Sequence, residues 1–104
     1  MIKINIQTSD EKILRLDIEG HAEYKPHGED LVCAGVSSIA IGLLNACDQL
    51  SDDCECSMND NHISIVVNNI DNERTQIILQ TGVIQLKTIH ESYSAYIKLS
   101  KQEV

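Results

Sequence analysis

Two runs near the start of the chain alternate between apolar and polar residues, and this alternation limits the possible folds more than any other feature. In residues 2–7 every second residue is an isoleucine, and residues 12–19 repeat the pattern with Leu14, Leu16 and Ile18 on the apolar side. A period of two is typical of a strand with one buried face. Turn-forming residues at 8–10 separate the runs, so we expect a hairpin.

The rest of the chain carries helix and strand patterns in a regular order. From about residue 31 to 50, apolar residues recur at three and four positions, which predicts a largely buried helix. Residues 54–58 and 62–68 alternate again, a second helix is expected from about 71 to 93, and a last strand at 96–101. This order predicts an α/β (α+β) fold in which two helices pack on one face of a four- to five-stranded mixed or antiparallel sheet.

Length and charge restrict the class of protein. The 104 residues contain no Pro, Gly or Ser-rich linker, so we expect a single domain over residues 1–104. The formal net charge of −8 disfavours direct nucleic-acid binding because it repels phosphates. An acidic surface favours a basic partner, and ribosomal proteins are one such class, although solubility is the simpler interpretation of the charge.

We expect a soluble cytoplasmic protein. The start of the sequence lacks the charged and apolar regions of a secretory signal. The longest apolar stretch, around residues 31–44, is interrupted by serines and glycines and is shorter than the roughly 18 residues of a membrane span, so no membrane association is expected. In the cytoplasm the cysteines would be reduced thiols.

A long loop between the hairpin and the first helix holds the residues with the most suggestive chemistry. Residues 20–30 contain two glycines, two histidines, three acids and the only proline, without periodicity. Most connections in compact domains run about 4 to 6 residues, so a loop of this length is more often a lid or binding loop. His21 closes the strand before the loop, and Cys33 lies near the start of the helix after it.

Cys33 and His21 together would form a cysteine nucleophile with its base. In the first turn of the helix, Cys33 would lie near free backbone N–H groups and the positive end of the helix dipole, which favour a thiolate. The dipole contributes at most about 2 kcal/mol, so a cationic partner is also needed, and His21 supplies it if the loop folds back. The same N–H groups could stabilise the oxyanion of a tetrahedral intermediate. Spacing alone does not distinguish this dyad from a buried, inert cysteine.

Asp30 and Ser37 are candidates for supporting roles. Asp30 is placed as the N-cap of the helix, a duty that competes with orienting His21. Ser37 lies one turn after the cysteine, where its hydroxyl either supports the site or satisfies a helix carbonyl. His27 is a second candidate base and is nearer to Cys33 in sequence, but we favour His21 because a strand end fixes it.

The residues around this loop match a known pattern. The matching positions are Gly20, His21, Ala22, Gly28, Asp30, Val32, Cys33, Ala34, Val36 and Ser37. Together they resemble the signature of the Prp family, the ribosomal-processing cysteine proteases, and the spacing from histidine to cysteine agrees. Residues 77–99 resemble the family's closing segment, so the likeness spans the chain. Two places depart from the family pattern. Glu23 stands where the family often has glycine, and the Pro26-His27 pair replaces residues that are more often acidic and aromatic.

The resemblance implies a small α/β homodimer with a protease dyad, His21 as the base and Cys33 as the nucleophile, and no cofactor. It assigns Gly20, Ala22 and Gly28 to the loop that contacts the substrate. It also implies removal of the N-terminal extension of large-subunit ribosomal protein twenty-seven. A non-catalytic ribosome-associated binding module is the alternative, and a redox thiol switch is weaker because the loop holds no second cysteine.

The remaining cysteines and histidines favour structural interpretations. Cys54 and Cys56 share the inner face of a strand, and their spacing matches no standard zinc pair. We therefore expect them to pack in the core and expect no metal site. His62 should point outward from its strand, and His90 lies on an otherwise apolar helix row.

Overall fold

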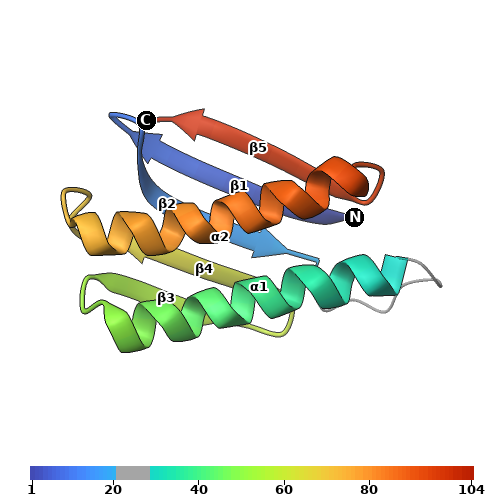
Figure 1. Cartoon of the computed structure of the whole chain (residues 1–104), viewed down its shortest axis with the longest axis horizontal. Coiled ribbons are helices and arrows are strands. Elements are labelled where there is room, and N and C mark those ends of the chain that lie inside the picture. The colour runs from blue at the N-terminus through green and yellow to red at the C-terminus, as the bar shows by residue number, and fades with distance from the viewer. Residues whose placement is uncertain (21–28) are drawn as a thin grey trace.

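Five strands form one sheet in the order β3, β4, β2, β1, β5 (Figure 1). The structure is a computed structural model that describes residues 1–20 and 29–104. Its elements are β1 (Ile2–Ser9), β2 (Lys12–Glu19), α1 (Glu29–Leu50), β3 (Cys54–Met58), β4 (His62–Val67), α2 (Glu73–Ser92) and β5 (Ile97–Glu103). Every predicted element is present, including the fifth strand, and their order is the predicted one.

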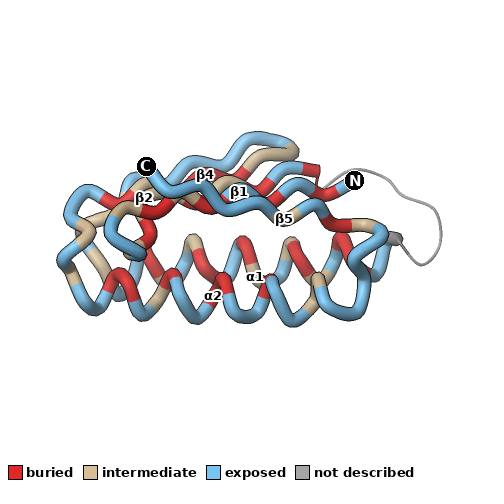
Figure 2. The backbone as a smooth tube through the Cα atoms, turned by 90° about the horizontal axis from the view of Figure 1, so that it is seen from above, coloured by how far each residue is buried: buried red, intermediate tan, exposed pale blue. Residues whose placement is uncertain are grey.

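The sheet is mixed and both helices cover the same face of it. β1 with β2, β2 with β4 and β3 with β4 are antiparallel, whereas β1 and β5 are parallel. Seen along the sheet, α1 and α2 lie side by side in one layer and the strands in the other (Figure 2). The predicted fold class is therefore confirmed. The opposite face of the sheet is open and carries mainly polar side chains, as antiparallel sheets commonly do.

The core lies between the sheet and the inner sides of the helices. The isoleucines of β1 point into it, as the alternation predicted, and meet Val36 and Leu43 of α1 and Leu79 and Leu86 of α2. Burying an aliphatic side chain of this size contributes about 1.5–3 kcal/mol. This layer holds the end of β2 beside the start of α1, where the candidate residues gather.

A register shift in the hairpin changes one predicted core residue. The pairing of β1 with β2 shifts between Gln7 and Thr8, so Ile13 is buried and Leu14 is only half-buried. The prediction that Leu14 faces the core is therefore wrong, because an irregular pair reverses the alternation beyond it. Gln76 of α2 satisfies the freed backbone of Ile13, since its amide accepts from the Ile13 N–H at 2.8 Å and donates to the carbonyl at 2.8 Å.

The first helix begins earlier than its apolar pattern indicates. α1 starts at Glu29, two residues before the predicted start, because polar residues in a first turn leave no periodic signal. Asp30 therefore lies within the first turn and is not the N-cap, so that prediction is wrong. An acidic residue in a first turn still suits the helix dipole. Cys33 becomes the fifth residue of the helix and lies just beyond the first turn, not within it.

The length and composition of α1 also suit a membrane span. Among the residues that the structure describes, Asp30–Leu50 is the one helix long and apolar enough to cross a membrane, with a mean hydropathy of 1.7. The prediction that this stretch is too short is wrong, because its serines and glycines lower the hydropathy only slightly. A helix packed in a protein core passes the same test, and α1 contributes Val32, Val36 and Leu43 to the core.

The second helix has a defined start and two different sides. Asn72 is its N-cap, and the Asn72 side chain accepts a hydrogen bond from the Thr75 N–H at 3.2 Å. The row of Leu79, Val83 and Leu86 is buried. The parallel row that begins at Ile77 and continues through Ile84 is exposed, so one apolar side of α2 has no partner within the described chain.

Candidate active site

Gly20 directly follows β2 and has a backbone conformation that favours glycine. Its φ is +86°, and an added Cβ would lie 2.8 Å from the Met1 carbonyl oxygen and 3.3 Å from the Ile2 Cα. Its N–H donates to the carbonyl oxygen of Asn61 at 3.1 Å. Any larger residue would combine left-handed backbone strain with a steric clash. The chain therefore leaves the sheet here through a fixed, tightly packed turn.

Cys33 lies beside this turn, although thirteen positions separate the two residues in sequence. Its side chain is buried, with 6% exposure, and its Sγ lies 3.9 Å from the Gly20 carbonyl oxygen, within reach of a weak S–H to oxygen hydrogen bond. Helical side chains lean toward the N-terminus, so the thiol lies over the first turn of α1. The fold thus brings the strand end and the helix start together, as the dyad hypothesis requires.

The other predicted site residues divide into two groups. Asp30 is exposed in the first turn of α1, and Ser37 is half-buried one turn after Cys33. His21, Ala22, His27 and Gly28 lie outside the described residues, so the dyad geometry stays a prediction. The backbones of Met1 and Asn61 also border the site. Neither residue was predicted, because each borders this turn through a main-chain oxygen, and a main-chain contact leaves no signal in residue type.

The remaining three cysteines gather at the other end of α1. Cys47 is buried, Cys54 is half-buried and packs against the core, and Cys56 is exposed. The prediction of core packing is wrong for Cys56, because β3 is the edge strand and the end of α1 covers only part of it. Burial and the neighbouring Cys54 raise the pKa of Cys47 to about 12. Within residues 1–20 and 29–104 no group of three side chains is arranged to hold a metal ion.

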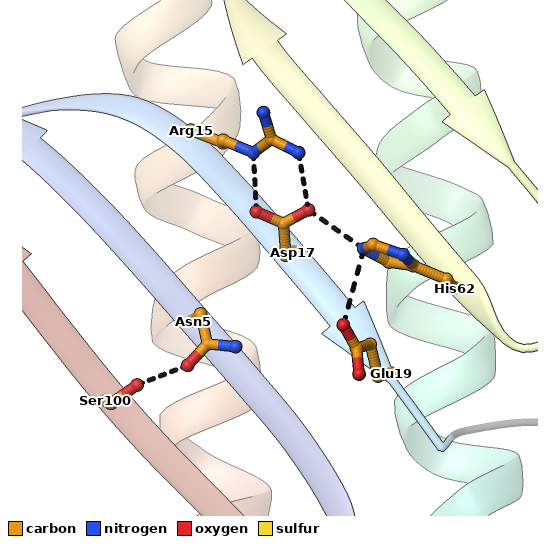
Figure 3. A network of polar contacts seen from close by, with 6 residues as sticks. All are labelled: Asn5, Arg15, Asp17, Glu19, His62 and Ser100. Carbon is orange, nitrogen blue, oxygen red and sulfur yellow. Dashed lines mark hydrogen bonds and ion pairs between the residues drawn. The ribbon is translucent and has the colours of Figure 1, made fainter.

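His62 belongs to a polar network on the open face of the sheet (Figure 3). It points outward, as predicted, and its Nε2 lies 2.9 Å from Asp17 Oδ1 and 3.8 Å from Glu19 Oε1. Arg15 donates to both oxygens of Asp17, at 2.7 and 3.2 Å. Partial burial raises the pKa of the Asp17 carboxyl, but hydrogen bonds from Arg15, His62 and Ser64 outweigh it and the net shift is downward. This histidine lies on the face opposite the helices and is not a partner for Cys33.

Comparison with known proteins identifies the family of this chain. The family model described as cysteine protease Prp matches residues 1–98. The chain belongs to this family. It is therefore a cysteine protease, as the residues around the loop suggested.

Relatives of known name and structure agree with this assignment. The ribosomal processing cysteine protease Prp of Staphylococcus aureus is 36% identical over 104 residues, covering 96% of this chain and 98% of that protein. The crystal structure of the Staphylococcus aureus Prp protease with a substrate peptide has a TM-score of 0.90 and 33% identity, covering 98% of this chain and all of that one. A second structure, with a covalently linked product peptide, has a TM-score of 0.86 and 34% identity.

Proposed function

We propose that this protease removes the N-terminal extension of large-subunit ribosomal protein twenty-seven, using Cys33 as nucleophile and His21 as base within a single domain over residues 1–104. The observation that carries the proposal is the 3.9 Å distance between Cys33 Sγ and the Gly20 carbonyl oxygen. Relatives that are called ribosomal processing proteases, one of them crystallised with a substrate peptide, support the substrate class. The cytoplasm, where thiols stay reduced, suits the reaction.

Position favours Cys33 over the other three thiols. It lies on a helix near the positive end of the dipole, and its side chain leans toward the first turn of that helix. Cys47 lies near the opposite, negative end, which disfavours a thiolate. Cys54 and Cys56 lie on an edge strand and not on a helix. A cysteine protease needs a thiolate nucleophile, and Cys33 is the cysteine that lies within a helix close to its start.

Connectivity favours His21 as the base. His21 follows Gly20 directly in the sequence, and a trans peptide keeps consecutive Cα atoms about 3.8 Å apart. The residue after Gly20 therefore starts from a point close to the Cys33 thiol. His27 is six positions further along and has no such constraint. His62, the described histidine nearest in sequence to these elements, is engaged with Asp17 on the open face.

The proposed chemistry follows the general order of cysteine proteases. His21 accepts the proton of the Cys33 thiol, and the thiolate attacks the scissile carbonyl carbon. Free N–H groups at the start of α1 stabilise the oxyanion of the tetrahedral intermediate. Protonated His21 then gives its proton to the leaving amine, and an acyl-enzyme remains on Cys33. Water, deprotonated by His21, hydrolyses that thioester, and the Cys33 thiol is released. No step needs a cofactor.

The flanking residues receive secondary roles in this proposal. Ser37 lies one turn below Cys33 on the same side of α1, where it supports the packing around the thiol. Asp30 places a carboxylate in the first turn of α1, where it can orient His21. Gly20, Ala22 and Gly28 shape the chain that contacts the substrate.

A cleavage assay tests the proposal directly. The substrate is a peptide that spans the extension and the mature start of the host's ribosomal protein, and product is followed by mass spectrometry. Wild-type protein should cut once at the junction, and Cys33→Ala should bind the peptide without cutting it. Binding of the peptide by wild-type protein without any cleavage would instead support the non-catalytic binding module.

We also propose that the chain forms a homodimer through the outer surface of the two helices. α1 carries no charged residue between Asp30 and Asp48, and α2 exposes Ile77 and Ile84 at 63% and 64%. The hydroxyls of Thr81 and Thr88, on the same row, already donate to the carbonyl oxygens of Ile77 and Ile84 at 2.8 Å. The row from Ile77 to Thr88 is therefore uncharged and needs few hydrogen bonds from outside.

Charge and area make a second copy the best-fitting occupant. Two chains of charge −8 repel each other, so a self-contact is most favourable where neither copy is charged. A helix of 22 residues is about 33 Å long, and two helices side by side are about 20 Å wide. A surface of this size gives roughly 600 Å² per copy, or roughly 1,200 Å² for the two copies together. A specific interface needs at least about 1,000 Å² in total. A groove of about 470 Å³, lined by Gly42, Gly82 and Ile77 among others, accepts side chains from the partner.

Sedimentation analysis of Ile84→Glu tests the helix surface. We expect a dimer for the wild type and a monomer for the variant, because the new carboxylates would face each other. Met58→Glu, on the edge strand with a similar exposure of 58%, is the matched control and should stay dimeric. A monomeric wild type, or a dimer that Ile84→Glu leaves intact, would contradict this surface.

A further inference from the structure

The two edges of the sheet differ in how well they are protected. β3 and β5 form these edges (Figure 1). Natural proteins blunt an edge strand with lysines, prolines or bulges, because its unpaired backbone groups otherwise pair with another chain. β5 carries Lys98 and Lys101. β3 carries neither lysine nor proline, and it keeps one register with β4 throughout. The β3 edge is therefore the one that can accept a further strand.

The backbone of β3 presents unused hydrogen-bonding groups at this edge. Asn59 donates its N–H to the His62 carbonyl oxygen, and Asp53 accepts the Asn68 N–H, both at 2.9 Å. Hydrogen-bonded residues alternate along an antiparallel strand, so the odd-numbered residues bond to β4. The even-numbered residues point their N–H and C=O groups outward: Cys54, Cys56 and Met58. In the part of the chain that the structure describes, no other protein group bonds to them.

One end of this edge lies at the catalytic end of the sheet. Met58 pairs with Ile63 of β4, which pairs with Ile18 of β2. Ile18 lies two residues before Gly20, whose carbonyl oxygen contacts Cys33. Adjacent strands are about 4.8 Å apart, so a strand added to β3 would lie roughly 14 Å from β2. An extended chain covers this distance in about four or five residues. A polypeptide that reaches Cys33 can therefore also pair with β3.

The charge around β3 selects a basic occupant. Residues 26–73, which include β3 and the turns at both of its ends, contain nine acidic side chains and no lysine or arginine. Glu55 on the strand, and Asp52 and Asp60 on the two turns, are exposed. None of these three forms an ion pair within the described residues. A basic chain is attracted to this edge, whereas a second copy would bring the same acids to it and be repelled.

We propose that an extended basic segment of the substrate polypeptide adds to the five-stranded sheet as a sixth strand beside β3. Its basic character follows if the substrate is a ribosomal protein, as in the proposed function on which this docking rests, because such proteins bind RNA phosphates. The segment belongs to the mature side of the junction, since the RNA-binding body is what remains after processing. Outward backbone groups of β3 supply affinity, as in other strand additions.

The two sides of the added strand would meet different surfaces. Met58 lies on the helix side of the sheet, because its partner Ile63 is buried there. Glu55 lies on the open side, since successive side chains of a strand alternate. The bound segment should therefore place lysine or arginine side chains beside Glu55. Its alternate side chains should be apolar or small, because they lie next to Met58, which is 58% exposed.

Cleavage of two peptides by the wild-type protein tests the docking. The short peptide has about four residues on each side of the junction, too few to reach along β3. The long peptide continues further into the basic mature region. We expect a KM for the long peptide about 10-fold lower than for the short one, at similar kcat, because only the long peptide pairs with the edge. Equal KM values for the two peptides would overturn the docking and leave the proposed function intact.

Variants of β3 identify the surface. Cys56→Pro removes one outward N–H and spares the ladder with β4, so it should raise the KM of the long peptide about 3- to 10-fold and leave the short peptide unchanged. Cys56→Ala keeps the N–H and is the matched control, so it should behave like the wild type. Glu55→Lys leaves the backbone unaltered and should raise the KM of the long peptide about 3-fold. An unchanged KM in both Cys56→Pro and Glu55→Lys would contradict the proposal.

A binding measurement separates the docking from the cleavage chemistry. Cys33→Ala protein lacks the nucleophile, so fluorescence anisotropy of the labelled long peptide measures docking even if neither peptide is cut. Absence of any cleavage by the wild type would contradict the proposed function and not the docking. In the Cys33→Ala background, Glu55→Lys and added salt should each weaken binding. Binding that neither change affects would overturn the proposal, and so would a dimer that Cys56→Pro converts to a monomer in sedimentation.

Discussion

The two buried cysteines of α1 have different chemistry because different elements meet them. Cys33 and Cys47 lie about four turns apart on the same core-facing side of one helix, and both are nearly inaccessible. Cys33 lies beside the end of β2, where its Sγ contacts the Gly20 carbonyl oxygen. The next residue in the sequence after Gly20 is His21. Cys47 lies at the end of α1 that packs against the edge strand β3, which carries Cys54 and Cys56. Neither burial nor residue type distinguishes them, so we infer that the second element decides their roles.

The largest effect should come from replacing Cys33, with the replacement of Cys47 as its control. Cys33→Ala should lower kcat/KM for the junction peptide by at least about 1,000-fold, because no other group replaces the nucleophile. Cys47→Ala, the matched control on the same helix side, should keep most of the activity and lose about 1–2 kcal/mol of unfolding free energy. Steady-state cleavage and urea unfolding measure both. Equal losses of activity in the two variants would contradict the proposal that Cys33 is the nucleophile and Cys47 is not.

The choice of histidine gives the next largest effect. His21→Ala should reduce kcat/KM by about 100- to 10,000-fold, the usual range for a general acid–base residue. His27→Ala is the rival and should lose less than His21→Ala. His62→Gln, on the open face, should leave cleavage nearly unchanged. A loss that is greater at His27 than at His21 would move the base into the middle of the loop.

The turn that brings the two elements together should be sensitive to a single methyl group. Gly20→Ala forces an added Cβ to within 2.8 Å of the Met1 carbonyl oxygen at a φ of +86°, which should cost about 1–3 kcal/mol of unfolding free energy. Cleavage should fall as well, because the turn holds the end of β2 beside Cys33. Urea unfolding of Gly20→Ala with wild-type stability would show that the turn relaxes freely.

The smallest effect should come from the open face of the sheet, which supports neither cysteine directly. Since the folded pKa of Asp17 is below its ordinary value of 3.8, its contribution is present above pH 4 and is lost as the pH falls through the folded pKa. Asp17→Asn should therefore cost about 1–2 kcal/mol at pH 7, and the difference from wild type should shrink near pH 2. A difference that is independent of pH would contradict the ion-pair origin. Cleavage at pH 7 should not change.

Local pattern was sufficient for most of the fold. The alternation of β1 and the three-four spacing of α1 depend on side chains within each element, so they are readable from the chain itself. The shift that buries Ile13 in place of Leu14 depends on how two strands pair. The exposure of Cys56 depends on β3 being the edge of the sheet, and strand order has no local signal.

The sequence points to candidate residues for the site but not to its detail. His21 and Cys33 could be proposed because the loop between them is long and carries a family pattern. The start of α1 at Glu29 was not, since polar residues at a helix end have no periodicity, and this moved Asp30 out of the N-cap position. The contribution of Met1 and Asn61 is made by backbone atoms. Tertiary structure alone brings such atoms to a site.

The most direct test of the account is the alkylation rate of each cysteine, measured by mass spectrometry with iodoacetamide across pH 6 to 9. In the wild type, Cys33 should react well below pH 8 despite its burial, whereas Cys47 should remain unreactive. His21→Ala should remove the reactivity of Cys33 at low pH and leave Cys56 unchanged. If Cys33 reacts no faster than Cys56 at pH 7, or if His21→Ala has no effect on it, the two buried cysteines of α1 do not differ in the way proposed.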